Sequence, residues 1–385
     1  MKKFLVLLLA LAMVFAFAAC ADDAANNDDA ANNDAAALTA ETIKIGHIHI
    51  NDEAEQGYST AHINGVNAMA EALGIPAENV IGKYNISEDG GCDTALRELV
   101  EEGCNIIFCD SFGHEDFMLE VAAEYPEIYF IHATGYQCAG SGLDNVSNFF
   151  GNVYEARYLS GIVAGLTTES NILGYVTAQE YAECISGFTG FYLGALSVNP
   201  DVTMNVVYTN TWYDVTLESQ AASALIASGA DVLGQHADST ATQSTCEAEG
   251  AYGVAYNTDM SSVAPNANLC SVVWNWGPAY TYFVETILAG TAFADIPADY
   301  SAGLAEGMVD LVYNKPLVDS LDNAQEIYDA VDAAREAIIA GDLYVFSGPL
   351  NDAEGNEIVA EGEKFIEPAS APSWNYIIEG ITVIR

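Results

Sequence analysis

Residues 105–133 read NIIFCDSFGHEDFMLEVAAEYPEIYFIHA and contain one complete repeat of the pattern that decides the fold. The apolar runs 105–109 and 128–133 have the length of buried strands, and residues 115–125 between them place apolar residues at helical spacing. A strand, a helix and a second strand in this order predict neighbouring parallel strands. Because these strands are apolar along most of their length, we expect helices on both faces of the sheet.

The same alternation repeats along the chain. Further strands are predicted at 43–50, 80–86, 172–177, 203–208, 231–235, 253–257 and 269–274, and further helices at 93–102, 156–167, 187–198, 215–228, 240–249, 280–289 and 323–339. The turn-rich stretch 140–145 interrupts the pattern, which restarts near Gly151. The sequence therefore predicts an α/β protein of two lobes, each built on a doubly wound parallel sheet.

The first twenty residues, MKKFLVLLLALAMVFAFAAC, have the features of an export signal. Two lysines precede an apolar run from Phe4 to Phe17, which is shorter than the about 20 residues of a membrane-spanning helix. Small residues directly before Cys20 resemble the lipobox of bacterial lipoproteins, in which cleavage leaves a lipidated cysteine at the N-terminus. We predict a lipoprotein signal peptide at 1–20 and an extracytoplasmic protein that is lipid-anchored to the cell membrane through Cys20. An ordinary signal peptide cut near Ala19 is the alternative.

Residues 21–42, ADDAANNDDAANNDAAALTAET, follow the signal. This tract is acidic and has no aromatic residue, so it cannot bury enough apolar surface to offset the entropy of ordering. We predict a disordered acidic tether.

The charge balance of the chain limits the class of ligand. The sequence has 55 acidic residues against 10 basic ones, a formal net charge of −45. A nucleic-acid partner is disfavoured, because few Lys or Arg side chains are present to neutralise phosphates. A neutral or cationic small molecule fits better, although most of the acidity is explained by the solubility of an exported surface.

Metal and catalytic motifs are missing from the sequence. The seven cysteines after Cys20 form no C-x-x-C pair, and no clustered Cys/His spacing suggests a zinc site. We expect most of these cysteines to be buried as small apolar side chains. Neither G-x-S-x-G nor H-E-x-x-H occurs, so we predict no catalytic residue, metal or cofactor, and disfavour an exported enzyme such as a nucleoside hydrolase.

The carboxyl ends of the predicted strands carry aromatic rings beside carboxyl, hydroxyl and amide groups. Ligands of open α/β sheets bind beyond these ends, and such groups suit a cleft that stacks a flat ring and hydrogen-bonds its rim. Two other roles stay open: tryptophans can pack in the core or between lobes, and a serine can cap the following helix. The candidate ligand-binding residues are Tyr58, Ser111, Phe112, Trp212, Asp238, Asp259, Asn275 and Trp276.

Five segments carry a resemblance to a known family: DSFG (110–113), NTWYD (210–214), HADST (236–240), YNTDM (256–260) and VWNWGP (273–278). In this order they resemble the basic membrane protein (BMP) family of ABC-transporter substrate-binding lipoproteins, which is related to bacterial purine nucleoside receptors. The similarity covers residues 43 to about 360. The word "basic" in the family name does not describe this acidic chain.

The resemblance implies a type I periplasmic-binding-protein fold: two Rossmann-like lobes, three hinge crossings and a ligand trapped in the interlobe cleft. Lobe 1 would comprise residues 43–150 plus about 276–306. Lobe 2 would comprise 151–275 plus about 307–345, which leaves 346–385 as a C-terminal segment.

The resemblance also implies roles for individual residues. Tyr58 stands where relatives place a Trp or Phe, and with Trp212 it would sandwich a purine-type base. Phe112 would line the pocket from lobe 1. Asp238 and Asp259 would accept hydrogen bonds from the base or from ribose.

Asn275 and Trp276 would close the floor of the pocket near the hinge. One departure bears on the ligand: nucleoside receptors of the family carry a Lys that contacts ribose after the last major strand, and the corresponding stretch here, WNWGPAY (274–280), has none. This difference favours a free purine base over a nucleoside.

The predicted function is therefore capture of a purine base or nucleoside, with the base favoured, by the extracytoplasmic solute-binding lipoprotein of an ABC importer. A membrane permease would recognise the closed lobes, and we expect the protein to be a monomer. The alternatives are a sensory binding protein and an importer component for another flat heterocycle such as riboflavin.

Overall fold

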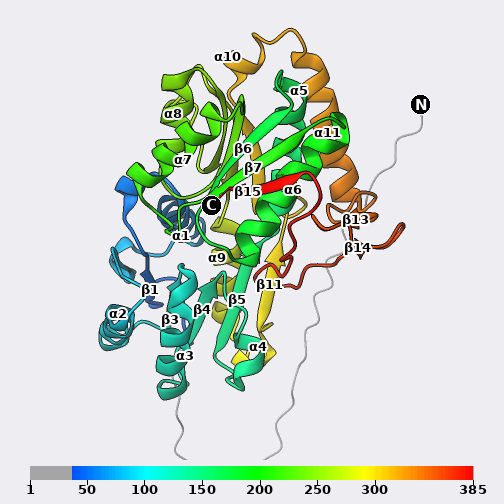
Figure 1. Cartoon of the computed structure of the whole chain (residues 1–385). Helices are drawn as coiled ribbons and strands as arrows, with labels where there is room; N and C mark the ends of the chain where they lie inside the picture. The colour runs from blue at the N-terminus through cyan, green and yellow to red at the C-terminus, as the bar shows by residue number, and fades with distance from the viewer. Residues whose placement is uncertain (1–36, 385) are drawn as a thin grey trace, which may run out of the picture. The chain divides into compact units, whose positions relative to one another are not determined.

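The computed structural model describes residues 37–384, which form two large sheets and a small hairpin (Figure 1). The predicted signal peptide, Cys20 and residues 21–36 of the predicted tether lie outside the described residues. The first sheet has the order β2-β1-β3-β4-β5-β11, and its strands all run parallel. Its strands are β1 (Ile45–Ile48), β2 (Val80–Lys83), β3 (Ile106–Cys109), β4 (Tyr129–Ala133), β5 (Val146–Gly151) and β11 (Asp299–Ala302).

The second sheet has the order β12-β10-β9-β8-β6-β7-β15. Its neighbouring strands pair in parallel except for β12, which runs antiparallel to β10. Its strands are β6 (Ile172–Thr177), β7 (Thr203–Tyr208), β8 (Val232–His236), β9 (Tyr252–Asn257), β10 (Asn268–Trp274), β12 (Val309–Tyr313) and β15 (Ile381–Ile384). The hairpin consists of β13 (Leu350–Asn351) and β14 (Glu357–Val359).

Helices cover both faces of each sheet. Those of the first sheet are α1 (Tyr58–Leu73), α2 (Gly90–Glu101), α3 (Glu115–Glu124), α4 (Cys138–Ser141) and α9 (Gly277–Leu288). Those of the second are α5 (Val153–Thr167), α6 (Ala182–Val198), α7 (Val215–Ala227), α8 (Ala241–Glu249), α10 (Lys315–Val318) and α11 (Ala324–Ala340).

Strand β3 shows why the central strands are apolar throughout. Its side chains alternate, so Ile106 and Phe108 join the apolar cluster of α1 and α9, whereas Ile107 and Cys109 join that of α2 and α3. Both sets are buried. The predicted α/β fold with parallel, doubly covered sheets is confirmed.

The chain passes between the two sheets three times: between β5 and α5, between β10 and α9, and between β11 and β12. We call the first sheet with its covering helices lobe 1, and the second sheet with its helices lobe 2. The lobe limits implied by the resemblance, given above as residue numbers, stay a prediction.

Several elements were not predicted. Strand β5 directly follows the turn-rich stretch 140–145, and β11 is a half-polar edge strand. Helix α1 contains Ser, Thr, Asn and Gly residues that weaken its apolar pattern. The last residues of the predicted tether are ordered, because Leu38 and Ala40 pack against the core and the Ile43 amide donates to the Thr39 carbonyl at 2.9 Å.

The C-terminal segment belongs to lobe 2. Strand β15 pairs in parallel with β7 and extends the second sheet, as Figure 1 shows in red. Upstream of it, the indole of Trp374 stacks on Phe346 with ring centroids 4.7 Å apart. We call residues 366–375 the C-terminal strap.

Within the described residues, the seven cysteines are buried and unpaired: Cys92, Cys104, Cys109, Cys138, Cys184, Cys246 and Cys270. In residues 37–384, no helix has the length and apolar character needed to cross a membrane. The same part of the chain holds no group of three side chains placed to ligate a metal ion.

Candidate functional site

A cavity lies between the carboxyl ends of the two sheets. Lobe 1 contributes Ile50, Tyr58, Asp110, Ser111, Phe112 and Thr134 to its wall. Lobe 2 contributes Glu183, Trp212, His236, Asp238 and Tyr256.

The topology explains why these residues meet. In lobe 1 the strand order reverses between β1 and β3, and all the cavity residues of this lobe except Thr134 follow these two strands. In lobe 2 the reversal lies between β6 and β8, which are followed by Glu183 and Asp238. Such switch points open a crevice at the carboxyl edge of a doubly wound sheet, and here the two crevices face each other.

Tyr58 is the first residue of α1, and its ring is fixed at the lobe 1 wall. Its hydroxyl donates to the Asp110 carbonyl at 2.8 Å, and its ring meets the edges of His62 and Trp276 at centroid distances of 4.5 and 6.1 Å. The residue is only 7% exposed. These contacts hold one aromatic wall of the cavity in place.

A row of aromatic rings crosses between the lobes. Phe112 of lobe 1 stacks on Tyr181 of lobe 2 at 5.1 Å, and Tyr181 in turn lies 6.0 Å from Trp212. Tyr136 extends the row on the lobe 1 side, 6.2 Å from Phe112, and is 58% exposed. Phe112 and Trp212 line the cavity, so the row runs from solvent to the site.

Three buried carboxyl groups face the cavity. Asp110 accepts from the Ile50 amide at 3.2 Å, and Asp238 accepts from the Asn257 side-chain amide at 2.9 Å. Glu183 lies 3.3 Å from His236 Nε2. Burial raises the pKa of Asp110 to about 7, that of Glu183 to about 8 and that of Asp238 well above its ordinary value. Near neutral pH these groups can therefore donate as well as accept hydrogen bonds.

Thr134 adds a hydroxyl to the wall. Its backbone has a φ of 68°, which is unusual for a β-branched residue, and it directly follows β4. Its buried Oγ1 has no hydrogen-bond partner among the described residues. A bound molecule is the natural partner for such a group in a cavity wall.

Five of the eight residues predicted from the sequence line this cavity: Tyr58, Ser111, Phe112, Trp212 and Asp238. Ser111 donates its hydroxyl to Glu88 at 2.6 Å and caps the turn that follows β3, so the capping role left open above is also present.

The other three lie elsewhere. Trp276 is fully buried between His62 and Trp274, with centroid distances of 4.1 and 4.3 Å. Asn275 is exposed at the crossing from β10 to α9 and donates to the Gly307 carbonyl at 3.0 Å. Asp259 is exposed, and its carboxylate accepts from the Ser261 amide in a turn. Their predicted contact with ligand receives no support from these positions.

Sequence reasoning did not select the remaining wall residues. Glu183 lies in the first turn of α6, ahead of the predicted start of that helix, and His236 is the last residue of β8. Tyr256 lies inside β9 rather than beyond its end. Asp110 directly follows β3, and that position was the one usable signal for it.

The two lobes also touch outside the cavity wall. Thr258 of lobe 2 donates its hydroxyl to the Gln56 carbonyl of lobe 1 at 2.7 Å. Next to it, Gly57 approaches the backbone of Asp238 so closely that a Cβ atom would lie 2.0 Å from the Asp238 carbonyl oxygen. In the C-terminal strap, the Ala371 amide donates to the Gly135 carbonyl of lobe 1 at 3.1 Å.

We expect the folding stability of the ligand-free protein to fall as the pH rises from 6.5 to 8. Burial raises the pKa of Asp110, Glu155 and Glu218 to about 7, and that of Glu183 to about 8, above the values that these groups have when unfolded. Their stabilising contribution is complete below the unfolded pKa and is lost as the pH passes the folded pKa. Burial lowers the pKa of the buried histidines, so their titration affects folding stability only below about pH 6.5.

Thermal unfolding across this pH range measures the effect. The double variant Glu183→Gln/Glu218→Gln should flatten the pH dependence, whereas the exposed-site control Glu120→Gln should leave it unchanged. Stability that rises steadily from pH 6.5 to 8 would contradict the expectation.

Solved structures share this architecture. An ABC transporter solute-binding protein from Conexibacter woesei superposes with a TM-score of 0.63 at 20% identity, covering 78% of this chain and 98% of the other. A solute-binding protein from Aeropyrum pernix K1 superposes with a TM-score of 0.65 at 18% identity, covering 78% of this chain and 92% of the other. The fold is the two-lobed periplasmic-binding type that these two proteins share.

Sequence comparison gives the family. The family model of PnrA-like ABC transporter substrate-binding proteins (Bmp) matches residues 44–341, and the chain belongs to this family. A purine-binding protein of Brucella abortus (strain 2308) is 32% identical over 90% of this chain and 94% of its own length. A Haloferax volcanii protein, provisionally named an ABC transporter glucose-binding protein, is 30% identical over 85% of this chain and 80% of its own length. The predicted family resemblance is confirmed, and the family consists of solute-binding proteins rather than enzymes.

Proposed function

We propose that this ABC transporter substrate-binding protein captures a purine base between its two closing lobes. The observation that carries the proposal is the cavity wall, in which aromatic rings and buried carboxyl groups from both lobes surround one small space. Flat rings gain from burial between aromatic faces, and buried carboxyl groups select ligands with matching donors. The purine-binding relative supports the same ligand class.

The charge of the cavity wall favours a base over a nucleoside. This wall contains neither Lys nor Arg, so no cation is placed there to hold a phosphate or to contact ribose. Thr134 Oγ1 and the carboxyl groups offer hydrogen bonds to ring nitrogens and exocyclic groups.

A sugar is the second candidate, because a relative carries a glucose-binding name and because carboxyl groups beside an aromatic ring also suit hydroxyl-rich ligands. Riboflavin and a sensory role stay alternatives. We also propose that the protein is an extracytoplasmic monomer, that a lipid on Cys20 anchors it, and that it delivers its ligand to a membrane permease.

The test is calorimetric titration of the full-length protein, unfolded and refolded beforehand to remove any co-purified ligand. Adenine, guanine, hypoxanthine and xanthine are compared with their nucleosides, riboflavin and glucose. We expect one free base to bind most tightly. The Trp212→Ala variant should weaken its binding about 10- to 100-fold, since stacking contributes about 1–3 kcal/mol per base.

Tyr136→Ala is the matched control, because this ring belongs to the same aromatic row but is exposed and lies outside the cavity wall. Its affinity should stay within about twofold of the wild type. Tight binding of glucose without any purine would replace the proposal by the sugar candidate, and a Trp212→Ala variant with unchanged purine affinity would place the base elsewhere.

A further inference from the structure

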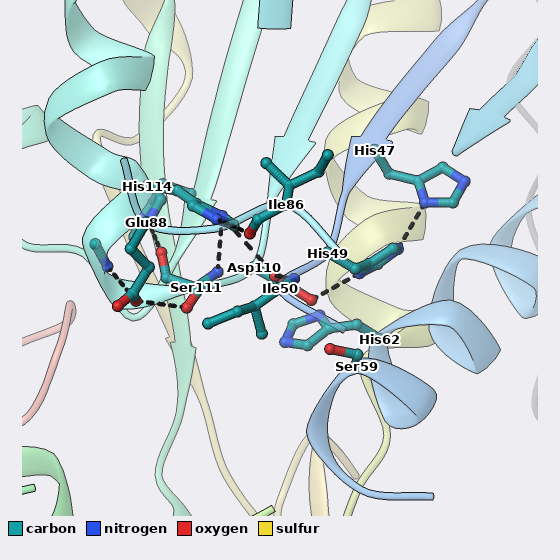
Figure 2. A network of polar contacts seen from close by, with 12 residues as sticks. His47, His49, Ile50, Ser59, His62, Ile86, Glu88, Asp110, Ser111 and His114 are labelled. Atoms are coloured by element: carbon teal, nitrogen blue, oxygen red, sulfur yellow. Dashed lines mark hydrogen bonds and ion pairs between the residues drawn. The ribbon is translucent and has the colours of Figure 1, made fainter. Parts of the chain in front are cut away.

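Two histidines and an aspartate form a continuous row in lobe 1, visible in Figure 2 from His47 through His49 to Asp110. His47 Nδ1 lies 2.6 Å from His49 Nε2, and His49 Nδ1 lies 2.7 Å from Asp110 Oδ2. The two histidines point to the same side of the chain because they are two residues apart in an extended segment. Asp110 is a wall residue of the ligand cavity.

The far end of the row lies near solvent. His47 is 4% exposed, and its ring meets the edge of Tyr84, which is 42% exposed. His47 lies in β1, and Tyr84 directly follows the neighbouring edge strand β2. His49 and Asp110 are each 1% exposed, so the row leads from a ring packed beneath the half-exposed Tyr84 to a buried carboxyl group.

We propose that His47 and His49 relay a proton between solvent and Asp110, and thereby set the charge that Asp110 presents to the ligand. The relevance to ligand rests on the proposed function, whereas the relay itself rests on the geometry of the row.

The proton balance is complete. With Asp110 ionised, His49 Nδ1–H donates to Oδ2 and His47 Nδ1–H donates to His49 Nε2. A proton that binds His47 Nε2 lets the Nδ1 proton of His47 pass to His49 Nε2, and the Nδ1 proton of His49 pass to Asp110 Oδ2. At the end Asp110 is a neutral acid, and both rings have changed tautomer without a net charge.

The surroundings keep both imidazole rings neutral before and after the proton transfer. Burial lowers the pKa of His49 to about 3 and that of His47 well below its ordinary value, so neither ring holds an extra proton near neutral pH. Burial raises the pKa of Asp110 to about 7, which places its change of charge in the physiological range.

Other titratable groups face the row and share in setting this charge. His114, whose Nδ1 lies 4.0 Å from Asp110 Oδ1, lowers the pKa of Asp110, and Glu88 raises it. Six further groups interact electrostatically with Asp110 or His49: Glu55, Tyr58, His62, Cys92, Cys109 and Tyr280.

A switchable Asp110 would affect selectivity. The ionised carboxylate accepts a hydrogen bond from a ring N–H, whereas the neutral acid can donate to an unprotonated ring nitrogen. The relay keeps Asp110 in contact with solvent protons even when the closed lobes exclude water from the cavity. Ligand binding should therefore be accompanied by uptake or release of a proton near pH 7.

The decisive experiment uses ligand-free, full-length protein with ¹⁵N-labelled histidine and ¹³C-labelled aspartate. The chain has six histidines, so single substitutions can assign each ring by NMR. We expect His47 and His49 to exchange tautomers together between pH 5.5 and 8.5, with the same midpoint as the Asp110 carboxyl signal. In Asp110→Asn the exchange should disappear, and in the control Asp299→Asn, an aspartate at the edge of the same sheet, it should persist.

Three results would overturn the relay: a tautomer pattern that stays fixed while Asp110 titrates, an imidazolium at either ring in this range, or an exchange that persists in Asp110→Asn. The wild-type titration decides the matter even if that variant does not fold. A second arm measures the enthalpy of adenine binding in buffers of different ionisation enthalpy, with a non-zero proton count expected near pH 7. Failure of all four free bases to bind would count against the proposed function and leave the NMR result standing.

Discussion

Gly57→Ala should weaken ligand binding by about 100-fold or more while the ligand-free protein stays folded. The added Cβ would lie 2.0 Å from the Asp238 carbonyl oxygen, which belongs to the backbone of the opposite lobe and cannot swing away like a flexible side chain. Overpacking costs about 1–3 kcal/mol in ordinary cores and more where backbone is fixed, and about 3 kcal/mol corresponds to roughly 100-fold in affinity. The closed arrangement bears this cost, and opening relieves it.

Calorimetry gives the affinity, and small-angle scattering with and without ligand shows whether the lobes still close. Gly90→Ala is the control, because a Cβ at that position meets no atom within 4 Å. Wild-type affinity in Gly57→Ala would mean that the arrangement described here is not the one that binds ligand.

Trp374→Ala is the second change with a large expected effect. The indole is fully buried against Phe346 and Phe365, with centroid distances of 4.7 and 5.1 Å, and its Nε1 donates to the Tyr376 carbonyl. Replacing a buried aromatic residue by alanine lowers the free energy of unfolding by about 3–5 kcal/mol. Since the strap bonds lobe 1 through Ala371, its loosening should also speed ligand release.

Denaturant unfolding, limited proteolysis of residues 366–375 and stopped-flow ligand release measure these effects. Ile366→Ala serves as the matched change, because that side chain belongs to the same strap but is 65% exposed. A loss of stability below about 1 kcal/mol in Trp374→Ala would show that the strap contributes little to lobe 2.

The sequence predicted most of the sheet architecture because central parallel strands have a readable pattern. Residues 172–177 and 203–208 are apolar or β-branched at most positions, and they form β6 and β7 with the predicted limits. Edge strands such as β11 lack this signal, since they are covered on fewer sides. Strand β15 follows an irregular segment and depends on a partner far away in the chain, so local pattern could not place it.

The sequence predicted those cavity residues that come shortly after the end of a strand. Phe112, Trp212 and Asp238 follow β3, β7 and β8, and the topology brings them together. Trp276 follows β10 in the same manner, yet the chain crosses to the other lobe at that point and the indole stacks in the core instead. Burial of a carboxyl group inside a helix, as for Glu183, has no signature in a single sequence.

The burial of the seven thiols determines how the protein responds to the oxidising conditions outside the cytoplasm. Burial raises the pKa of Cys92 and Cys246 to about 12, so the thiolate, which is the form that attacks disulfides and oxidants, is scarce in the folded protein. The described fold should therefore persist unchanged in oxidising and in reducing surroundings. Its maturation would need no disulfide-forming catalyst, and once folded it would be resistant to disulfide scrambling.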